Sequence, residues 1–370
     1  MASFRKRGKT WQYRVTYMDH NGERQEISKA GFRTKTEAKV AADKIEHELN
    51  SGINVQKGDM LFIDYYEEWI ETYKIGAYSL ETDRFYNDAV KIVNKYFKGV
   101  RLKEISRETY QQFLNDYSVG RAKETVRKAH TKIGAPLRDA FHNGHIPKNP
   151  AYRPTIRGAD GVKESEKFLN EGEAKAVLEA LLDDLQFNYI SRYMLILQFA
   201  TGMRISEVMG VTIKDLDFLH NRLDINKTWD YKFGQGFQPT KNKEERNISV
   251  DKDTMDIMKE FYDHQLSRKI VDSKGRLFAH KGKIPSINGI NKTLRRACKR
   301  AGVNEVTSHA LRHTHASILL LNGVSIAYIS KRLGHKNISI TSNTYSHVLD
   351  ELEARDESET IDIFSTIYNL

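Results

Sequence analysis

The chain has 370 residues, of which 39% are hydrophobic and 29% charged, and its net charge is +10. This length is more than one core commonly serves, so we expect two or three domains, and the charge favours an anionic partner such as nucleic acid. The single cysteine, Cys298, excludes an intramolecular disulfide, and without a long apolar run or a secretory signal we expect a cytoplasmic protein with no membrane contact.

The first predicted elements form a small sheet within residues 1–55. Apolar side chains alternate with polar ones over 11–18, a period of two that predicts a strand with one apolar face. Residues 19–22 supply a turn and 23–30 a returning strand, and a short third strand is expected at 31–34. We therefore predict a three-stranded sheet in this segment.

A helix is expected after the sheet. Thr34 or Thr36 can cap it, and one of its faces is apolar and would cover the apolar face of the sheet. The other face of the sheet, with Gln12, Arg14 and Thr16, stays open. A thin polar sheet can enter the major groove of DNA, so we predict that this domain binds DNA; the alternative is an accessory domain that binds none.

Residues 60–155 predict a helical domain. Apolar positions recur at helical spacing in four stretches, 60–75, 80–97, 105–117 and 125–141. The fourth helix is basic, and Lys123, Arg127 and Lys128 could lie along the phosphate backbone of a duplex, although a solvated basic face explains them equally well. Three prolines then end the pattern, and residues 158–163 predict a linker.

Residues 165–370 form the largest segment and predict an α+β domain. Asn170 can cap a helix with Glu173 in its capping box, and a second helix is expected at 190–199. Short strands are predicted at 223–229, 236–240 and 246–250, followed mainly by helices. The predicted fold is therefore multidomain and mainly α, with small β-sheets.

A polar run follows the second helix of this segment. Gly202 allows a sharp bend, so Arg204 is expected at a corner between two helices and close to a core. A buried guanidinium needs an anionic partner. That partner is either structural, with Glu207 the obvious candidate, or the phosphate of a substrate.

Two histidines and an arginine share a face of a later predicted helix. Arg312 stands at i+3 from His309, and His313 stands at i+4, a spacing that also suits metal ligands. A zinc hydrolase would carry glutamate after the first histidine, where Ala310 stands, and no third ligand follows at the required spacing. We therefore predict no metal site.

Two further motifs complete the set. The stretch Ser330–His335 ends in another histidine, and Tyr345 follows ten residues later. The chain has 18 tyrosines and 13 histidines, so none of these residues is informative alone. Their order along 201–345 makes them specific.

In these motifs the chain resembles the tyrosine recombinases, the phage-integrase family. The matching residues are Arg204 within Thr201–Glu207, His309-x-x-Arg312-His313, Leu333-Gly334-His335 and Tyr345. The resemblance implies a site-specific DNA recombinase, an integrase of a phage or other mobile element. It also implies an arm-type DNA-binding domain at 1–55, a core-binding domain at 60–155 and a catalytic domain at 165–370.

The resemblance implies a role for five of the matching residues. Tyr345 would attack a DNA phosphate, forming a 3′-phosphotyrosine and releasing a 5′-hydroxyl, and a hydroxyl of a partner strand would reverse the step. Arg204, Arg312 and His335 would donate to the phosphate oxygens. His309 would handle the proton of Tyr345 or assist the neighbouring arginine. Because the phosphotyrosine keeps the bond energy, no metal or other cofactor is implied.

The leaving 5′-hydroxyl needs a general acid, for which the family uses a lysine on a β-hairpin. Lys241 follows Thr240, as in the family's pattern, and lies between two predicted strands. Arg246 comes one residue sooner than the pattern expects, so Lys243 is the alternative.

The expected partner is double-stranded DNA with arm-type and core-type sites, bound by a homotetramer. Residues 349–370 carry seven acidic residues and one basic residue, so this segment should avoid phosphate. It rests either in solvent or on a neighbouring protomer, to which Ile361, Ile363, Phe364 and Ile367 offer an apolar element. By analogy we also expect a directionality factor and a host DNA-bending protein.

Two other functions fit parts of the pattern. A type IB topoisomerase shares the strand-cleavage chemistry, but the two N-terminal segments favour a recombinase. A DNA-binding accessory protein that has lost catalysis would lack some of the catalytic residue types, all of which are present.

Overall fold

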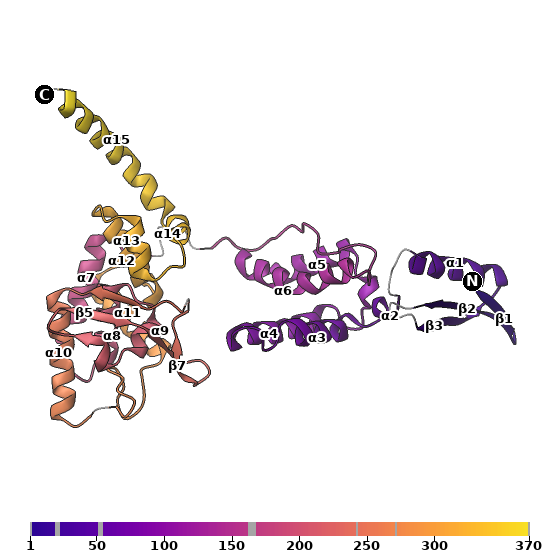
Figure 1. The fold of residues 1–370 in the computed structure, drawn as a ribbon, viewed down its shortest axis with the longest axis horizontal. Helices are drawn as coiled ribbons and strands as arrows, with labels where there is room; N and C mark the ends of the chain where they lie inside the picture. Colours follow the sequence, from indigo (N-terminus) through magenta and orange to yellow (C-terminus); the bar gives the residue numbers. More distant parts are fainter. Residues whose placement is uncertain are drawn as a thin grey trace. The chain divides into compact units, whose positions relative to one another are not determined.

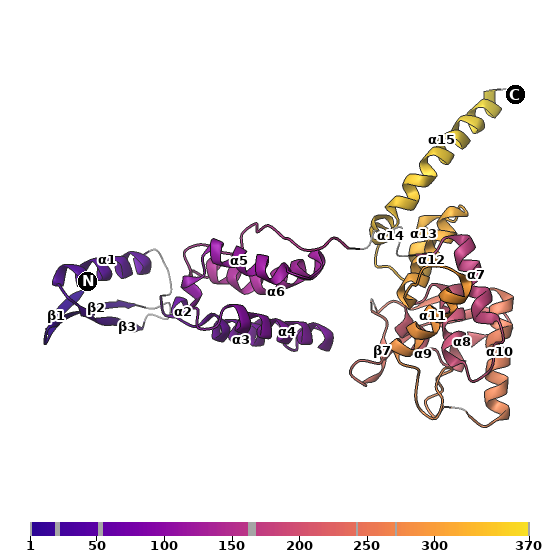
Figure 2. The same ribbon diagram turned by 180° about the vertical axis from the view of Figure 1, so that it is seen from behind.

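The computed structural model describes residues 2–18, 23–50, 55–161, 168–241, 243–270 and 272–368. It divides into two compact units, Met1–Gly161 and Val162–Leu370, each of which is described by itself (Figures 1 and 2). Small antiparallel sheets stand among many helices, which confirms the predicted fold class. In the described part of the chain, no helix has both the length and the apolar character needed to cross a membrane.

The chain begins with a three-stranded antiparallel sheet. Its strands are β1 (Ser3–Arg7), β2 (Thr10–Met18) and β3 (Arg24–Phe32), in that order across the sheet. The prediction of a third strand at 31–34 was wrong, because the third strand precedes the other two. The sequence of β1 carries three consecutive cations and no alternation, and the strand forms by backbone pairing with β2.

Helix α1 (Lys35–Asn50) covers one face of this sheet (Figure 1). Tyr13 and Val15 of β2 are buried with Ala42 of the helix, as the alternation predicted. Thr34 caps the helix, since its hydroxyl accepts from the backbone nitrogen of Glu37 at 3.1 Å. The aromatic face of β2 therefore packs against the helix, and its polar face remains open.

The four helices predicted within 60–155 are present, with ends that differ by a few residues. They are α3 (Phe62–Tyr73), α4 (Leu80–Tyr96), α5 (Arg107–Ser118) and α6 (Lys123–His142). Two short elements, α2 (Val55–Gly58) and η1 (Leu102–Glu104), were not predicted because so few residues show no periodicity. The shared core of the four helices is rich in aromatic side chains, and Trp69 of α3 donates to the carboxylate of Asp139 of α6 at 2.8 Å.

Val162–Leu370 surrounds its core with helices and two small sheets. Its first elements are α7 (Glu171–Leu182), α8 (Ile190–Thr201), α9 (Ile205–Gly210), η3 (Ile213–Asp215), β4 (Leu216–Asp217) and β5 (Arg222–Ile225). Then follow β6 (Lys227–Asp230), β7 (Gly236–Pro239), β8 (Arg246–Ser249), α10 (Lys252–Ser267) and α11 (Ile287–Ala301). The last elements are α12 (Ser308–Leu321), α13 (Ile326–Leu333), α14 (Ile338–Thr344) and α15 (Ser346–Tyr368).

The sheets of this unit have the orders β4-β5-β8 and β6-β7. The single strand predicted at 223–229 is two strands, since the chain changes partners at Asn226: β5 pairs with β8, and β6 pairs with β7. The amide of Asn226 donates to Asp215 at 3.3 Å, which anchors the change of direction.

The core of this unit is built around α8, which contacts α7, α10, α11 and α12. Asn170 and Glu173 form the predicted capping box of α7. Cys298 lies on the buried side of α11, with no exposed surface, and burial raises the pKa of its thiol. Helix α15 extends away from this core, and Ile361, Phe364 and other apolar side chains along it are more than half exposed (Figure 1).

Gly202, which ends α8, occupies a position that we expect to reject any side chain. Its φ is +67°, and a Cβ there would lie 2.6 Å from the ring of His315 and 2.8 Å from Leu333. Gly302 ends α11 with a φ of +68°, and a Cβ added there would meet no described atom within 4 Å. It is therefore a matched control for Gly202.

Gly202→Ala should destabilise the protein more than Gly302→Ala. Both variants lose about 1–2 kcal/mol through left-handed backbone strain, and Gly202→Ala loses about 1–3 kcal/mol more through overpacking. Urea unfolding of the two variants measures the difference. Equal losses would mean that His315 and Leu333 move aside freely.

Candidate active site

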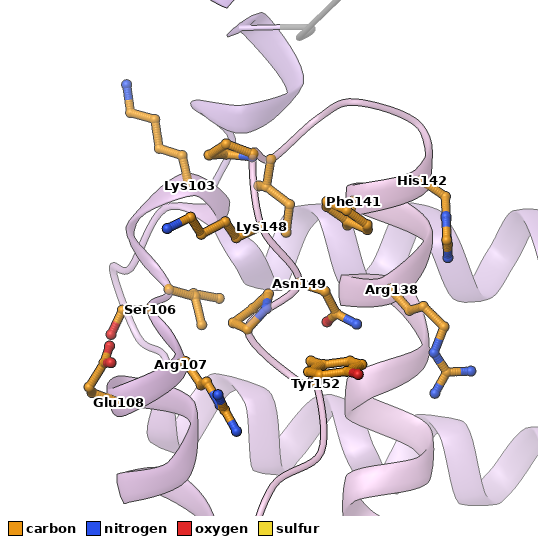
Figure 3. Close-up of a pocket in the computed structure, with 14 residues that line it drawn as sticks. Lys103, Ser106, Arg107, Glu108, Arg138, Phe141, His142, Lys148, Asn149 and Tyr152 are labelled. Carbon is orange, nitrogen blue, oxygen red and sulfur yellow. The ribbon is translucent and has the colours of Figure 1, made fainter.

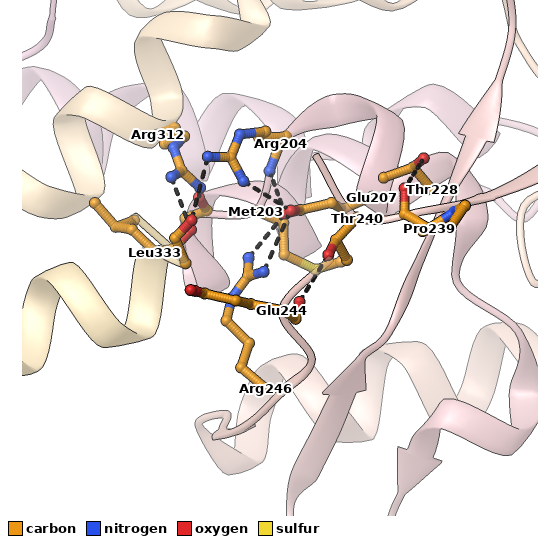
Figure 4. A network of polar contacts seen from close by, with 12 residues as sticks. Met203, Arg204, Glu207, Thr228, Pro239, Thr240, Glu244, Arg246, Arg312 and Leu333 are labelled. Atoms are coloured by element: carbon orange, nitrogen blue, oxygen red, sulfur yellow. Dashed lines mark hydrogen bonds and ion pairs between the residues drawn. The ribbon is translucent and has the colours of Figure 1, made fainter. Parts of the chain in front are cut away.

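Arg204 stands at the corner between α8 and α9, where it caps α9. Its backbone nitrogen donates to Oε2 of Glu207 at 2.9 Å, and its Nη1 donates to Oε1 of the same carboxylate at 3.0 Å. Its Nη2 reaches the carbonyl oxygen of Gly334 at 3.4 Å. Glu207 therefore has two roles: its carboxylate closes the capping box with the backbone of the N-cap residue Arg204, and it is the ion-pair partner of the Arg204 side chain (Figure 4).

Arg312 of α12 is 3% exposed and is held by two backbone carbonyls. Its Nη1 donates to Gly202 at 2.9 Å and its Nη2 to Leu333 at 2.8 Å. Arg204 and Arg312 are thus bonded to the carbonyls of two consecutive residues, directly before His335. Burial and then the charge of Arg204 lower the pKa of Arg312 to about 9, at which it still stays charged at neutral pH.

A third guanidinium joins this cluster from β8. Arg246 donates through Nη1 and Nη2 to the two oxygens of Glu207, at 3.2 and 2.8 Å (Figure 4). Its Nε donates to the carbonyl of Arg332 at 2.8 Å. A Cβ on Gly334 would lie 2.8 Å from Arg246, so glycine makes room for it. Sequence reasoning used Arg246 only as a spacing marker, because nothing in a linear pattern shows that it meets Glu207.

These three guanidiniums carry more positive charge than their partners neutralise. In the described part of the chain, their hydrogen bonds reach one carboxylate, that of Glu207, and otherwise only backbone carbonyl oxygens. Arg204 retains a 22% exposed side chain, so a ligand can reach it. Partly desolvated excess positive charge favours an anionic ligand, and guanidiniums match phosphate geometry.

His335 lies just after the two carbonyls that hold the arginines. Its Nδ1 is 2.7 Å from the hydroxyl of the buried Thr341. Burial and then the charges of Arg312 and Arg204 lower the pKa of His335 to about 4, so it is neutral at neutral pH. If the threonine donates to Nδ1, the hydrogen sits on Nε2, which can donate to a ligand.

Tyr345 lies between α14 and α15 and is 1% exposed. Its hydroxyl is 3.1 Å from Nδ1 of His313, and it packs with Leu333 and Val348 in a small apolar cluster. Burial raises the pKa of Tyr345 to about 12, and the charge of Arg312 partly opposes this. The structure therefore brings Tyr345 next to the arginine cluster, in a fully protonated state.

His309 is exposed and lies on the same helix as His313. The two rings are 4.8 Å apart, edge to face. Burial of part of the ring, then the charges of Arg312, Arg204 and Lys241, lower the pKa of His309. In the described residues it is His313, and not His309, that forms the hydrogen bond with Tyr345. No group of three His, Cys, Asp or Glu side chains in the described ranges is placed to hold a metal ion.

Lys241 follows β7 and is exposed. The hydroxyl of the preceding, buried Thr240 donates to the carbonyl of Glu244 at 2.7 Å, which ties the turn between β7 and β8 (Figure 4). Lys243, also exposed, has a φ of +57° within the same turn. Lys241 is close enough to His309 for its charge to contribute to the lowered pKa of that histidine.

The residues predicted to contact DNA lie in Met1–Gly161. Gln12, Arg14 and Thr16 point to the open face of the sheet, where Arg14 forms an ion pair with Glu26 at 2.9 Å. On α6, the predicted cations Lys123, Arg127 and Lys128 are exposed, and Arg127 pairs with Glu124.

Sequence reasoning missed a basic pocket in the helical domain. It is a cavity of about 1040 Å³ with the apolar side chains of Phe141 and Tyr152 in its wall. Its cations are Lys103, Arg107, Arg138 and Lys148 (Figure 3). They come from separate stretches of the chain, so no local pattern indicates them.

Three family models match the chain. The phage integrase family matches residues 167–351, the arm DNA-binding domain matches 3–49 and the phage integrase SAM-like domain matches 61–156. A tyrosine recombinase XerC-like protein of Caldanaerobacter subterraneus subsp. tengcongensis is 26% identical over 98% of this chain and 99% of its own length. The integrase of Staphylococcus phage L54a is 26% identical over 84% of this chain and 95% of its own.

Solved structures show the same fold. The Tn1549 transposon integrase in complex with transposon right end DNA has a TM-score of 0.68 at 20% identity, covering 82% of this chain and 100% of that one. A lambda integrase dimer bound to a core site has a TM-score of 0.59 at 18% identity, covering 92% and 93%.

Fold, site and relatives define a class of protein, the tyrosine recombinases, enzymes that cleave and rejoin DNA strands. Within this class, the chain belongs to the phage integrase family. The relatives do not favour a type IB topoisomerase, since they are named as recombinases, integrases and transposases.

Proposed function

We propose that this protein is an integrase that moves a mobile element by cutting and rejoining DNA through a 3′-phosphotyrosine on Tyr345. The observation that carries the proposal is the convergence of Arg204 and Arg312 on the carbonyls of residues 333 and 334, beside His335 and Tyr345. Excess positive charge at this corner would bind a phosphate, and the phenol of Tyr345 beside it would be the nucleophile.

In this proposal the nucleophile, the donors to the phosphate and the acid for the leaving group are each assigned to a residue. Oη of Tyr345 attacks the phosphorus, while Arg204, Arg312 and Nε2 of His335 donate to the non-bridging oxygens. Glu207 holds Arg204 in place. The bond to the 5′-oxygen breaks, and that oxygen takes a proton from Lys241. A 5′-hydroxyl of a partner strand later attacks the phosphotyrosine and restores the phosphodiester.

The choice of Lys241 over Lys243 is supported by the charge that Lys241 exerts on His309. The buried Thr240 anchors the chain immediately before it. The cleavage rates of Lys241→Ala and Lys243→Ala can be measured on two substrates, one whose leaving group needs a proton and one whose leaving group does not. Only the variant that lacks the general acid should regain its rate on the second substrate.

We also propose how the rest of the chain engages DNA. Residues 1–55 would bind arm-type sites with the open sheet face, and 60–155 would bind core-type sites with α6 and the basic pocket. Catalysis would lie in 165–370, in a homotetramer on DNA in the cytoplasm, with α15 contacting a neighbouring copy. A directionality factor and a host DNA-bending protein would set the direction of the reaction.

Incubation of the protein with two labelled attachment-site duplexes tests the function. An integrase yields joint products that combine both labels, through a covalent protein–DNA intermediate. Relaxation of supercoiled DNA by a monomer without joint products would instead indicate a topoisomerase, and binding without any adduct would indicate an accessory protein.

Removing two cations of α6 should weaken DNA binding in a salt-dependent way. The double variant Lys123→Ala, Lys128→Ala should bind a duplex more weakly, and the slope of log affinity against log salt should fall by about 0.9 for each phosphate that the protein no longer neutralises. Fluorescence anisotropy at several salt concentrations measures the slope. Lys252→Ala, which removes an exposed lysine of α10, is the control, and an identical slope in the double variant would place α6 away from the phosphates.

A further inference from the structure

The hydroxyl of Tyr345 has a histidine partner, His313, to which the family resemblance assigns no role. Nδ1 of His313 lies 3.1 Å from Oη of Tyr345, and the two ring centroids are 5.7 Å apart. This is hydrogen-bond distance, and it is also the distance over which a proton can pass to a general base. His313 is half-buried, one residue along α12 from Arg312.

The tyrosine needs such a partner. Burial raises the pKa of Tyr345 to about 12, so almost none of it is phenolate at neutral pH. The charge of Arg312 lowers this pKa but does not restore the ordinary value. A group that removes the proton as the bond to phosphorus forms avoids populating the free phenolate.

We propose that His313 is a catalytic residue that accepts the proton of Tyr345 during strand cleavage. This inference rests on the proposed function, in which Tyr345 is the nucleophile. The O–H bond of Tyr345 breaks, its proton passes to Nδ1 of neutral His313, and the oxygen forms a bond to phosphorus. The bond to the 5′-oxygen breaks, and that oxygen takes its proton from the general acid. In the reverse step the imidazolium returns its proton to the phenol.

The other histidines are less well placed for this step. Nδ1 of His335 is occupied by Thr341 at 2.7 Å. His309 contacts His313 and not Tyr345: its ring lies edge to face against the ring of His313, with the centroids 4.8 Å apart. Among the described residues, the titratable or charged groups shown to contact or adjoin His313 include His309, Arg312 and Tyr345. His335 lies close enough for His313 to act on its pKa.

His313→Asn separates proton transfer from hydrogen bonding. The asparagine amide can occupy the place of Nδ1 and keep a hydrogen bond to Tyr345, but it cannot take up a proton at neutral pH. His313→Gln is the second variant, in case the first folds poorly. Thermal midpoint and DNA affinity, which a purely structural role would change, verify the fold of each variant.

The substrate is a nicked suicide duplex made in two forms. One carries the ordinary phosphodiester, and the other carries sulfur in place of the bridging 5′-oxygen. The sulfur leaves without a proton, because thiols have a pKa of about 8.5. Lys241→Ala should therefore be slow on the oxygen form and be rescued on the sulfur form, so this variant reports on the leaving group alone.

His313→Asn should form the covalent adduct about 100-fold to 10,000-fold more slowly than wild type on both substrates, the size of a general-base contribution. Its rate should also keep rising with pH over a range in which the wild-type rate is constant, because the variant depends on loss of the phenol proton to solvent. His309→Asn should not show this pattern.

Two results would overturn the proposal in different ways. If wild type forms the adduct and His313→Asn forms it equally fast on the sulfur substrate, His313 is not the proton acceptor and the integrase function stands. If wild type forms no adduct with either substrate, the proposed function is wrong and the role of His313 falls with it.

Discussion

Tyr345→Phe is expected to bind DNA like the wild type and to form no covalent adduct with a nicked suicide duplex. The substitution removes only the hydroxyl, so the ring continues to fill the apolar cluster with Leu333 and Val348. Loss of the hydrogen bond to His313 costs about 1 kcal/mol of stability. Phenylalanine has no atom that can form a bond to phosphorus, so the loss of adduct is complete.

Denaturing gels of the protein–DNA mixture measure the adduct, and a gel shift measures binding. Tyr328→Phe is the matched control, because Tyr328 of α13 is 49% exposed and should trap the adduct at the wild-type rate. An adduct with Tyr345→Phe would show that another tyrosine is the nucleophile, and peptide mapping of the adduct would identify it.

Glu207→Gln is expected to cause the largest loss of stability among single changes at the site. The carboxylate is fully buried and accepts from Arg204 and Arg246 through both oxygens. The amide nitrogen of glutamine donates and cannot accept, so one of the two acceptor positions is lost. The side chain is also neutral, so Arg204 and Arg246 keep their charge without a counter-charge. Removing one partner of a buried ion pair costs about 3–5 kcal/mol.

This carboxylate also makes stability depend on pH. Burial alone would raise the pKa of Glu207, but the hydrogen bond from Arg246 and the charges of Arg246, Arg204 and Arg312 outweigh it, and the pKa lies below its ordinary value of 4.5. A lowered folded-state pKa stabilises the protein above the unfolded value, and this contribution is lost as pH falls through the folded value. Wild type should therefore lose stability below about pH 4.5, and Glu207→Gln should lose less over that range.

Urea unfolding at pH 7 and at pH 4 measures both effects. Glu179→Gln, an exposed glutamate of α7, is the control and should be close to wild type at both values. A Glu207→Gln protein as stable as this control at pH 7 would mean that the ion pairs to Arg204 and Arg246 contribute nothing net. Cleavage should fall together with stability, since Arg204 loses the partner that orients it.

Elements with a clear period were predictable, and those held only by partners were not. The helices α3 to α6 and the strand β2 each repeat apolar residues at their own spacing. Strand β1 has no such pattern and forms because β2 offers a free edge. The change of partner at Asn226 likewise depends on Asp215, a contact that spacing does not reveal.

The same distinction holds at the site. Arg204, Arg312, His335 and Tyr345 could be chosen from short motifs, because each motif is local in sequence. The contacts of Arg246 with Glu207 and of His313 with Tyr345 join residues that lie 39 and 32 positions apart. Such pairs become visible only when the fold brings them together.

Cys298 has a practical consequence for experiments on this protein. It is the only cysteine of the chain, it has no exposed surface on α11, and burial keeps its thiol protonated. A maleimide dye reacts with exposed thiolate, so it should leave Cys298 unmodified in the folded state. One cysteine introduced on β1 or α15 would then take a single fluorophore without any other change. Energy transfer from that fluorophore to labelled DNA could follow each end of the protein through a recombination cycle.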